Sequence, residues 1–391
     1  MEFKAFKTRI YPSTKQIKQF RKAFGTRRWI WNWAIETYFN GYKQGVQWTA
    51  YKLDTEINRL RSKDPDKYGW IGDVNTMVKS EAIKDFGISL QAWLKRLKKH
   101  SHEMGIDKES FDIGKPKFRS RKDSKQSFRL FKKAYNTFQV KGKHTFNFNW
   151  TCKYGHMNVL TRESIAFLKD KDIKTMTIEM VAGRYYMSVV YASNKPQLPH
   201  GTGTVGLDLG IKHAVVTFNG TESETFDIPQ TIRKYEKQQE RFQRKLSRMT
   251  YGSKNYEKQK LLVERACQRQ ANSRRDFLDK LTYKLVTTYD TIKVDDFSFN
   301  GAMNLKRSRR ALLRVAPSSL KYLLEIKCEN HGVKLFYIPK GTPTTQVCSH
   351  CGQRPQKRID LGARTYKCTH CGTILDRDEN AARNVYKYEI I

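Results

Sequence analysis

Residues 204–218 read TVGLDLGIKHAVVTF, and this stretch decides the fold. Its alternation predicts a strand with Val205, Leu207 and Leu209 on one face and Asp208 between two glycines on the other. Glycines inside a strand suggest the close approach of another backbone or a ligand. A second strand should follow and end at a tight turn at Asn219–Gly220. Asp208 is therefore either a solvated acid at a strand end or a group that faces a ligand.

Two later stretches carry similar acids. TIKVDDFSFNG, residues 291–301, is a β-prone run that ends in Asp295 and Asp296. LDRDENAARNVY, residues 375–386, places Asp376 as a helix cap and Asp378 in the first helical turn. A strand, an acid, a turn and a strand open the RNase H-like fold, in which acids from separate elements converge on two metal ions. Together with Asp208, Asp378 is better explained as a metal ligand than as a favourable helix charge.

Four cysteines near the C-terminus form two C-x2-C pairs, CSHC and CTHC, separated by sixteen residues. Two such turns, each followed by glycine, can direct four thiolates to one point, as in zinc ribbons. A redox pair is the alternative, and the histidines inside the pairs could compete as ligands. We expect one structural zinc held by Cys348, Cys351, Cys368 and Cys371.

The composition points to a polyanionic partner. The 391 residues carry a formal charge of +37, and 12% are aromatic. Nucleic-acid-binding proteins combine positive charge for phosphates with rings for unstacked bases; the alternative is a merely basic protein. The charged start MEFKAFKTRIYPS predicts no signal peptide, and no apolar run is long enough to predict a membrane span. The chain is therefore expected in the cytoplasm.

The remaining segments alternate between helical and strand-like patterns. Residues 2–12 read as a strand, and Ser13 or Thr14 can cap a helix that Gly25 is expected to end. Thr26 can cap the next helix. Strand-like segments follow the basic stretch 114–133, with a hairpin at Ala182–Gly183, and could form a small antiparallel barrel. After a linker near 193–204, long helices are predicted over 230–290, and the basic segment 301–311 is expected to lack regular structure.

The chain resembles the TnpB family of transposon-encoded RNA-guided nucleases, the compact relatives of type V CRISPR effectors. The order and spacing of the matching segments agree over essentially the whole chain. The segments that carry the resemblance are FKTRIYPSTKQ, RRWIWNWAIE, GKPKFRSRKD, GLDLGIKHAVVTFNG, GTPTTQVCSHCG and YKCTHCGTILDRDENAARN.

The resemblance implies an α/β multidomain protein. A β-barrel wedge domain would contain an inserted helical recognition domain, and an RNase H-like RuvC nuclease domain would contain an inserted zinc ribbon. The expected boundaries are 1–12 for the first wedge strand, 13–110 for the recognition domain, 111–197 for the wedge barrel, 198–340 for the first two RuvC motifs, 341–375 for the zinc ribbon and 376–391 for the last RuvC motif.

The resemblance also assigns a catalytic site. Asp208, Asp295 and Asp378 match the three RuvC acids that hold two Mg²⁺ ions, and Asn380 is expected to support them through hydrogen bonds. The second acid of the family is usually Glu, so Asp295 departs from the pattern. Three interpretations follow: Asp295 still binds the metal, Glu325 replaces it, or the protein has lost cleavage and is an RNA-guided DNA binder such as a repressor.

The implied partners are a guide RNA made from the transposon end and a double-stranded DNA target, with one protein for each guide RNA. A short motif beside the target would be read by the protein, and Lys79 and Ser80 are candidates for this contact. A DNA-strand transferase is the other alternative, but no nucleophilic Tyr or Ser in a suitable context supports it. The expected contacts to RNA or heteroduplex phosphates are Lys115, Lys117, Arg119, Arg121 and Lys122.

Overall fold

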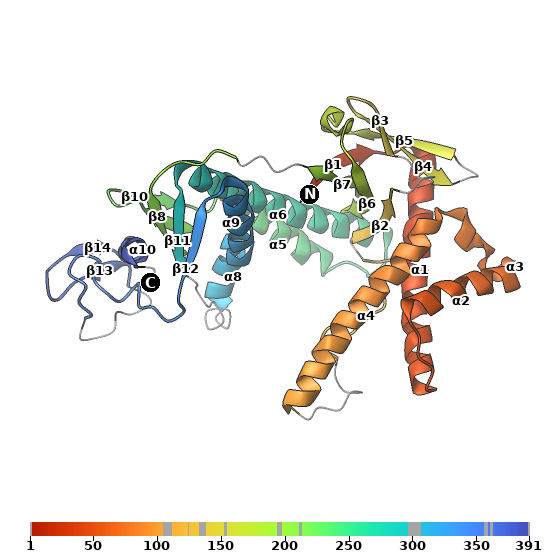
Figure 1. Cartoon of the computed structure of the whole chain (residues 1–391), viewed down its shortest axis with the longest axis horizontal. Coiled ribbons are helices and arrows are strands. Elements are labelled where there is room, and N and C mark those ends of the chain that lie inside the picture. Colours follow the sequence, from red (N-terminus) through yellow and green to blue (C-terminus); the bar gives the residue numbers. More distant parts are fainter. Residues whose placement is uncertain are drawn as a thin grey trace. The chain divides into compact units, whose positions relative to one another are not determined.

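The computed structural model divides the chain into two compact units, Met1–Asn194 and Lys195–Ile391 (Figure 1). Each unit contains helices and strands, so the protein belongs to the mixed α/β class. No helix among the described residues is long and apolar enough to cross a bilayer. The described residues are 2–104, 112–123, 125–132, 138–151, 155–193, 198–210, 213–295, 306–355, 359 and 363–389.

The first unit contains a seven-stranded antiparallel sheet in the order β2-β6-β7-β1-β5-β4-β3. Strands β2 and β4 are far apart in this order, yet the rings of Phe128 and Trp150 lie only 5.4 Å apart. Neighbouring strands are spaced by about 4.8 Å, so the sheet must curl strongly around its core. The strands are β1 (Glu2–Tyr11), β2 (Lys125–Phe131), β3 (Phe138–Gly142), β4 (Thr145–Thr151), β5 (Gly155–Thr161), β6 (Ile173–Val181) and β7 (Arg184–Ser193).

The predicted hairpin at Ala182–Gly183 is confirmed. It joins β6 to β7, and both residues have a positive φ, 50° and 71°. A positive φ at both central positions is typical of the tight turns that match the twist of paired strands.

The helices of the first unit form a second core beside the sheet. Ser13 caps α1 as predicted, but the helix end predicted at Gly25 is wrong, because α1 continues through it. Phe24 packs into the core of the sheet, whereas Trp31 packs among the helices. This packing on both sides of Gly25 outweighs a glycine cost of about 1 kcal/mol. The helices are α1 (Thr14–Lys43), α2 (Ala50–Lys63), α3 (Pro65–Tyr68) and α4 (Thr76–Met104).

The second unit is built on a five-stranded mixed sheet in the order β10-β9-β8-β11-β12. Strands β8 to β10 pair antiparallel, and the predicted turn at Asn219–Gly220 joins β9 to β10. Strand β11 lies parallel to both β8 and β12, so the carboxyl ends of these three strands meet at one edge. The strands are β8 (Thr204–Asp208), β9 (Val215–Phe218), β10 (Ser223–Phe226), β11 (Thr291–Asp295) and β12 (Lys334–Ile338).

Four long or basic helices accompany this sheet: α5 (Gln230–Leu246), α6 (Lys254–Thr288), α8 (Lys306–Val315) and α9 (Pro317–His331). The expectation that 301–311 lacks regular structure is wrong from Lys306 onward, and residues 301–305 lie outside the described part. Arg314 Nε lies 2.7 Å from Glu236 of α5, and Arg310 pairs with Glu240 at 3.5 Å. Carboxylates of α5 therefore offset the positive charge of α8.

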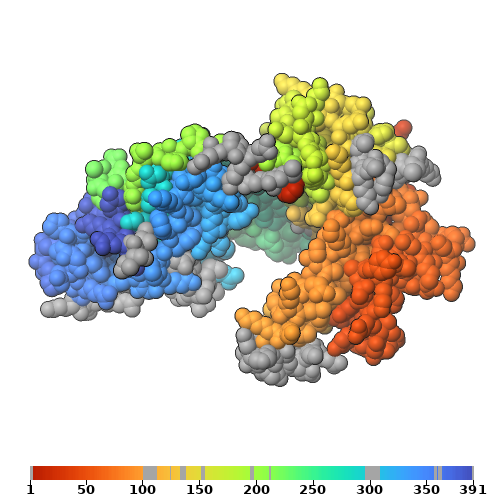
Figure 2. Space-filling view, viewed as in Figure 1, coloured from red at the N-terminus to blue at the C-terminus, as the bar shows by residue number. Residues whose placement is uncertain are grey.

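The C-terminal residues contain the cysteine pairs, a short antiparallel pair of strands and a final helix. These elements are β13 (Thr365–Lys367), β14 (Ile374–Asp376) and α10 (Arg377–Lys387). In Figure 2 the blue C-terminal residues lie together in one continuous region of the surface. Helix α10 follows β14 without a break, so the cysteine pairs lie close in sequence to the helix that carries Asp378.

Candidate active site and nucleic-acid interface

The four cysteines form one cluster, as predicted. Their sulfur atoms all lie within 4.8 Å of one another. The two turns repeat the same backbone bonds, since Gly352 N donates to Cys348 O at 2.9 Å and Gly372 N donates to Cys368 O at 3.1 Å. Both glycines have a φ near 75°, a conformation that other residues rarely adopt. Four converging sulfurs fit a tetrahedral metal ion such as zinc, whereas His350 and His370 are exposed and lie outside the cluster.

Asp208 and Asp295 are brought together by the parallel pairing of β8 with β11. Each acid is the last residue of its strand, and the register pairs Val294 with Leu207. The next position on both strands therefore carries an acid on the same face of the sheet. Asp208 is 2% exposed and Asp295 is 7% exposed, which shows that neither is a solvated strand end.

The third acid, Asp378, comes from α10, which covers this face of the sheet. An added Cβ at Gly206 would lie 2.6 Å from Ala382 O, so only glycine permits this close packing. Asp376 caps the helix as predicted, because its side chain accepts from Asp378 N at 2.9 Å. Asp378 itself is buried in the first turn. The helix packing therefore places its carboxylate next to the strand ends.

Lys293 anchors the other end of α10. It lies two residues before Asp295, on the same face of β11, and its Nζ donates to Tyr386 O at 2.8 Å and Tyr388 O at 2.7 Å. Burial lowers the pKa of this amine. A cation at the carboxyl end of a helix is favourable, so Lys293 helps to fix the axis of α10 over the strands.

Electrostatic repulsion marks these acids as one site. Burial, followed by the charges of Asp378 and Asp295, raises the pKa of Asp208 well above its ordinary range. Asp208 Oδ1 and Asp378 Oδ2 are buried without a hydrogen-bond partner among the described residues. Leaving a buried charged oxygen without a partner costs about 1–3 kcal/mol or more. A divalent cation would satisfy both oxygens, so the donor set fits a hard metal such as Mg²⁺.

Two arginines, which the sequence analysis did not single out, lie beside Asp378. Arg364 Nη1 is 3.8 Å from Asp378 Oδ2, and Arg377 Nη2 is 3.5 Å from Asp378 Oδ1. Arg364 comes from the segment between the two cysteine pairs. Its place could not be predicted from spacing, because only the folding of that segment against α10 brings it near the acids.

The structure also locates the other predicted site residues. Asn380 is fully buried, but it bonds the first cysteine turn rather than a carboxylate: its Oδ1 accepts from Ser349 N at 2.8 Å and its Nδ2 donates to Val347 O at 2.7 Å. Glu325 is exposed, and its Oε1 accepts from Tyr337 Oη at 3.1 Å. The acids that raise the pKa of Asp208 do not include it. Asp296 lies outside the described residues.

The basic segment 115–122 packs along α1. Asn32 fixes its backbone through two reciprocal bonds, accepting from Arg119 N at 2.8 Å and donating to Arg119 O at 3.0 Å. The Arg119 guanidinium lies 3.6 Å from the centre of the Trp31 ring. Lys115 is half-buried beside Phe39. The remaining predicted contacts, Lys117, Arg121 and Lys122, are exposed.

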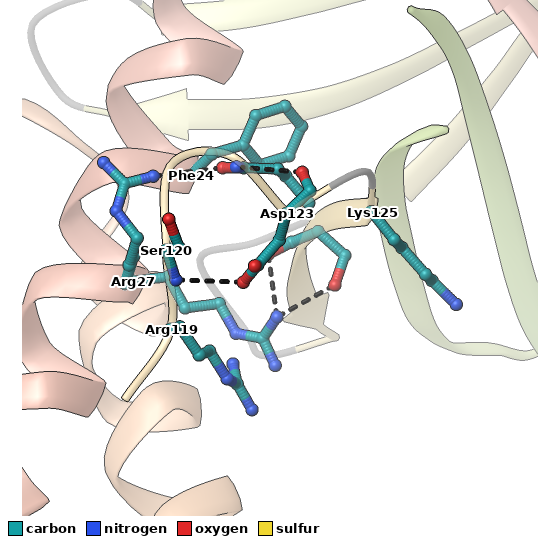
Figure 3. A pocket seen from close by; sticks show the side chains of 9 residues that line it. Phe24, Arg27, Arg119, Ser120, Asp123 and Lys125 are labelled. Atoms are coloured by element: carbon teal, nitrogen blue, oxygen red, sulfur yellow. Dashed lines mark hydrogen bonds between the residues drawn. The ribbon is translucent and has the colours of Figure 1, made fainter. Parts of the chain in front are cut away.

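Arg119 also lines a pocket with Arg27, Arg28 and Lys125 (Figure 3). Arg27 is neutralised by Asp85 and donates to Ser127 O at 2.8 Å. Burial and the nearby charge of Arg27 lower the pKa of Arg119 to about 10. Lys125 pairs with Glu179 at 3.2 Å, and Asp123 also lines the pocket, so Arg28 and Arg119 are the side chains whose charge suits an anionic group such as phosphate.

Lys79 and Ser80 lie on α4. Lys79 is 6% exposed, and its Nζ is 3.2 Å from Asp54 and 2.7 Å from Asn58 Oδ1 on α2. Its charge is thus used to join two helices, and its position does not favour contact with nucleic acid. Ser80 is half-buried. The proposal that these residues read a DNA motif stays a prediction.

Three family models match separate segments of the chain. A model described as "Helix-turn-helix domain" matches residues 1–47, one described as "Probable transposase" matches residues 188–306, and one described as "Cas12f1-like, TNB domain" matches residues 318–385. The last match spans both cysteine pairs and Asp378.

Other proteins are similar to this chain in sequence or in fold. A Streptomyces pristinaespiralis protein named "Putative RNA-guided DNA endonuclease" is 26% identical, over 98% of this chain and 88% of its own length. The "TnpB-like protein L79" of Acanthamoeba polyphaga mimivirus is 26% identical, over 55% of this chain and 43% of its own length. A solved structure titled "Cryo-EM structure of the Cas12f1-sgRNA-target DNA complex" aligns over 99% of both chains, with a TM-score of 0.50 and 12% identity, which shows a similar fold.

Proposed function

Because the chain belongs to the TnpB family, we propose that it is a transposon-encoded, RNA-guided DNA endonuclease. One observation carries the proposal: Asp208, Asp295 and Asp378 come from three distant segments and are buried at one edge of the sheet. Burying three carboxylates together is unfavourable unless cations compensate them. Apolar residues at these three positions would give a more stable fold, so stability alone does not explain the acids.

The three aspartates, Asp208, Asp295 and Asp378, would hold two Mg²⁺ ions. When bound, the ions would activate water and stabilise the charge that develops on the phosphodiester. The residues of this chain would exclude water and position the metal ligands. Burial keeps bulk water from the carboxylates, Lys293 and the close packing at Gly206 fix α10, and α10 orients Asp378.

The topology supports the proposed domain architecture. The sheet order β10-β9-β8-β11-β12, with an acid at the end of the central strand, suits an RNase H-like RuvC domain. The curled antiparallel sheet suits a wedge barrel, and α1 to α4 suit the inserted recognition domain. The boundaries 13–110, 111–197, 198–340 and 341–375 remain the proposed divisions. One zinc ion would occupy the four cysteines as a structural element, because a closed set of four thiolates leaves no position for a substrate.

The nucleic-acid partners would be a guide RNA from the transposon end and double-stranded DNA, bound by one protein per guide. Base pairing would supply most of the sequence specificity, while the protein senses the backbone and shape of the heteroduplex. The complex would act on DNA in a prokaryotic cytoplasm. Arg119 would bind a guide-RNA phosphate in the cationic pocket, and Lys115, Lys117, Arg121 and Lys122 would add charge around it.

Replacing Arg119 tests this RNA contact. Losing a bond to a charged group costs about 1.5–3 kcal/mol, so Arg119→Gln should weaken guide-RNA binding by roughly 10–100-fold. The slope of log affinity against log salt should also fall by about one. Arg121→Gln is the matched control, because Arg121 is exposed and should change affinity much less. Equal effects of the two variants would contradict a phosphate site at Arg119.

One observation favours a second function, a nuclease-deficient RNA-guided DNA-binding protein such as a transcriptional repressor. In the described part of the chain, the group whose ligand atoms all lie within 4.8 Å is the cysteine cluster, and the three carboxylates are not gathered so tightly. Asp295 is one methylene shorter than the Glu usual in the family. A displacement of about 1 Å can cost a hundredfold in rate.

Cleavage of a supercoiled target by the protein–guide RNA complex in Mg²⁺ separates the two functions. A nuclease should cut, and Asp208→Ala should lower the rate by at least about a thousandfold while target binding remains. Glu325→Ala is the matched acidic control and should cut normally, since Glu325 is exposed.

Asp295→Glu decides between the two outcomes. If the native complex binds its target but does not cut, and Asp295→Glu restores cutting, the protein is a binder. If the native complex neither cuts nor binds a target that matches its guide, the assignment as an RNA-guided protein fails.

A further inference from the structure

Thr344 lies in the stretch that leads into the first cysteine pair, and it touches the acid site. It is 5% exposed, and its Oγ1 donates to Asp295 Oδ2 at 2.7 Å. We propose that Thr344 is a positioning residue, whose hydroxyl holds one oxygen of Asp295 so that the other oxygen is presented to the metal. This inference rests on the nuclease site proposed above, but its test does not depend on cleavage.

Thr344 is itself fixed by backbone bonds on both sides. Its amide donates to Thr342 O at 2.8 Å, and its carbonyl oxygen accepts from Asn384 Nδ2 at 2.7 Å. Asn384 also donates to Val347 O at 2.8 Å, immediately before the first cysteine. The backbone that carries this hydroxyl cannot shift without breaking these bonds. The hydroxyl is therefore held in place to orient the Asp295 carboxylate.

Helix α10 thus helps to position two of the three acids. Asp378 belongs to α10 directly, and Asp295 is held by α10 through Asn384 and Thr344. The position of Asp208 is determined separately, by its own strand β8. The position of α10 therefore contributes to the spacing between Asp295 and Asp378, together with the strand β11 that carries Asp295.

The short side chain makes this support more important. Because Asp has one methylene fewer than Glu, it has less reach to compensate for a rotated carboxylate. Mg²⁺ demands near-ideal geometry. Partners that orient metal-binding side chains typically contribute 10–100-fold to metal affinity or activity, and we expect an effect of about that size here.

Two substitutions separate the hydroxyl from the packing of the methyl group. Thr344→Val keeps the shape and removes the hydroxyl, whereas Thr344→Ser keeps the hydroxyl and removes the methyl. Thr342→Val is the matched control, because the Thr342 hydroxyl donates to Pro339 O at 2.8 Å and not to a carboxylate, and the substitution leaves its backbone carbonyl in place. If Thr344→Val does not fold, Thr344→Ala against Thr344→Ser makes the same comparison.

The first readout is Mn²⁺ binding to the purified full chain without RNA, followed by electron paramagnetic resonance. Asp208→Ala defines the signal that belongs to the acid site. Thr344→Val should raise the Mn²⁺ dissociation constant by about 10–100-fold, while Thr344→Ser and Thr342→Val should stay close to the native value. In an Asp295→Asn background, Thr344→Val should cause no further loss.

The second readout is the Mg²⁺ concentration for half-maximal cleavage by the guide-RNA complex, which should shift by the same factor. A native chain that binds Mn²⁺ in a Thr344-dependent way but never cuts would support the positioning role and contradict the nuclease. Native Mn²⁺ affinity in Thr344→Val, a loss that persists with Asp295→Asn, or no Mn²⁺ binding sensitive to Asp208→Ala would each overturn the inference.

Discussion

The second unit holds two clusters of candidate metal ligands that differ in how they are built. The four cysteines come from two local turns of the same design, and their sulfurs lie within 4.8 Å of one another. The three aspartates come from two strands and a helix, and two of their oxygens are buried without a hydrogen-bond partner among the described residues. The first cluster is a closed set of ligands, whereas the second is held together against its own repulsion.

If both clusters bind metal, the cysteine site would stabilise the fold, whereas the aspartate site would lower the stability of the metal-free protein. Thiolates on short turns can gather around zinc, and zinc binding then contributes directly to folding. Burial, followed by the charges of Asp378 and Asp295, raises the pKa of Asp208, so its ionised carboxylate reduces stability when no cation is present. Removing a ligand should therefore have opposite effects on stability at the two clusters.

The largest effect is expected at the cysteines. Cys368→Ser should abolish binding of one zinc ion per chain and lower the free energy of unfolding by about 4–5 kcal/mol or more, because loss of a structural metal is among the most damaging changes. Zinc content by atomic absorption and unfolding in urea would measure both effects.

Cys267→Ser provides the control for this experiment. Cys267 is a half-buried thiol of α6, and burial raises its pKa. It should keep the zinc and most of the stability. A zinc content that is unchanged in Cys368→Ser would show that the cysteine cluster is not the zinc site.

A smaller effect of opposite sign is expected at Asp208. The folded chain binds the Asp208 proton more tightly than the unfolded chain does, because the folded pKa is raised. The stability of the metal-free protein should thus fall as the pH rises from the ordinary carboxyl range through this raised pKa. Asp208→Asn cannot ionise, so it should be more stable than the native protein by about 0.5–2 kcal/mol at pH 8.

Urea unfolding of the metal-free protein at two pH values would measure this difference. The advantage of Asp208→Asn should vanish below a pH of about 4, where the carboxyl is protonated in both states. Asp276→Asn is the control, since Asp276 is exposed and pairs with Lys280 on the helix surface. Destabilisation by Asp208→Asn at pH 8 would mean that the acids support the fold and would remove the contrast between the clusters.

Local patterns predicted much of what the structure contains. The C-x2-C spacing with following glycines predicted the cysteine cluster, and the Asx and glycine signals predicted the cap at Asp376 and the turn at Ala182–Gly183. These features depend on residues within a few positions of each other. The helix end expected at Gly25 failed because packing on both sides of the glycine outweighed its intrinsic cost, which no local pattern reveals.

The candidate site was predicted only in outline. The resemblance selected Asp208, Asp295 and Asp378, and the structure places all three at one edge of a sheet. The sequence did not single out Arg364 or Thr344, and it assigned Asn380 to the acids although it bonds a cysteine turn. Each of these contacts joins residues that are distant in sequence, so the alternation and spacing within single segments do not predict them.

The sequence by itself determined the charge, the two cysteine turns, the helix caps and the acids at two strand ends, because each of these is a property of a short segment. The tertiary structure decided which acids meet, which of their oxygens lack a hydrogen-bond partner among the described residues, and that Thr344 reaches Asp295. Parallel pairing of β8 with β11 and the packing of α10 on Gly206 are long-range events. The contacts that stabilise this pairing and packing form between segments that are distant in the sequence, so they exist only in the folded chain.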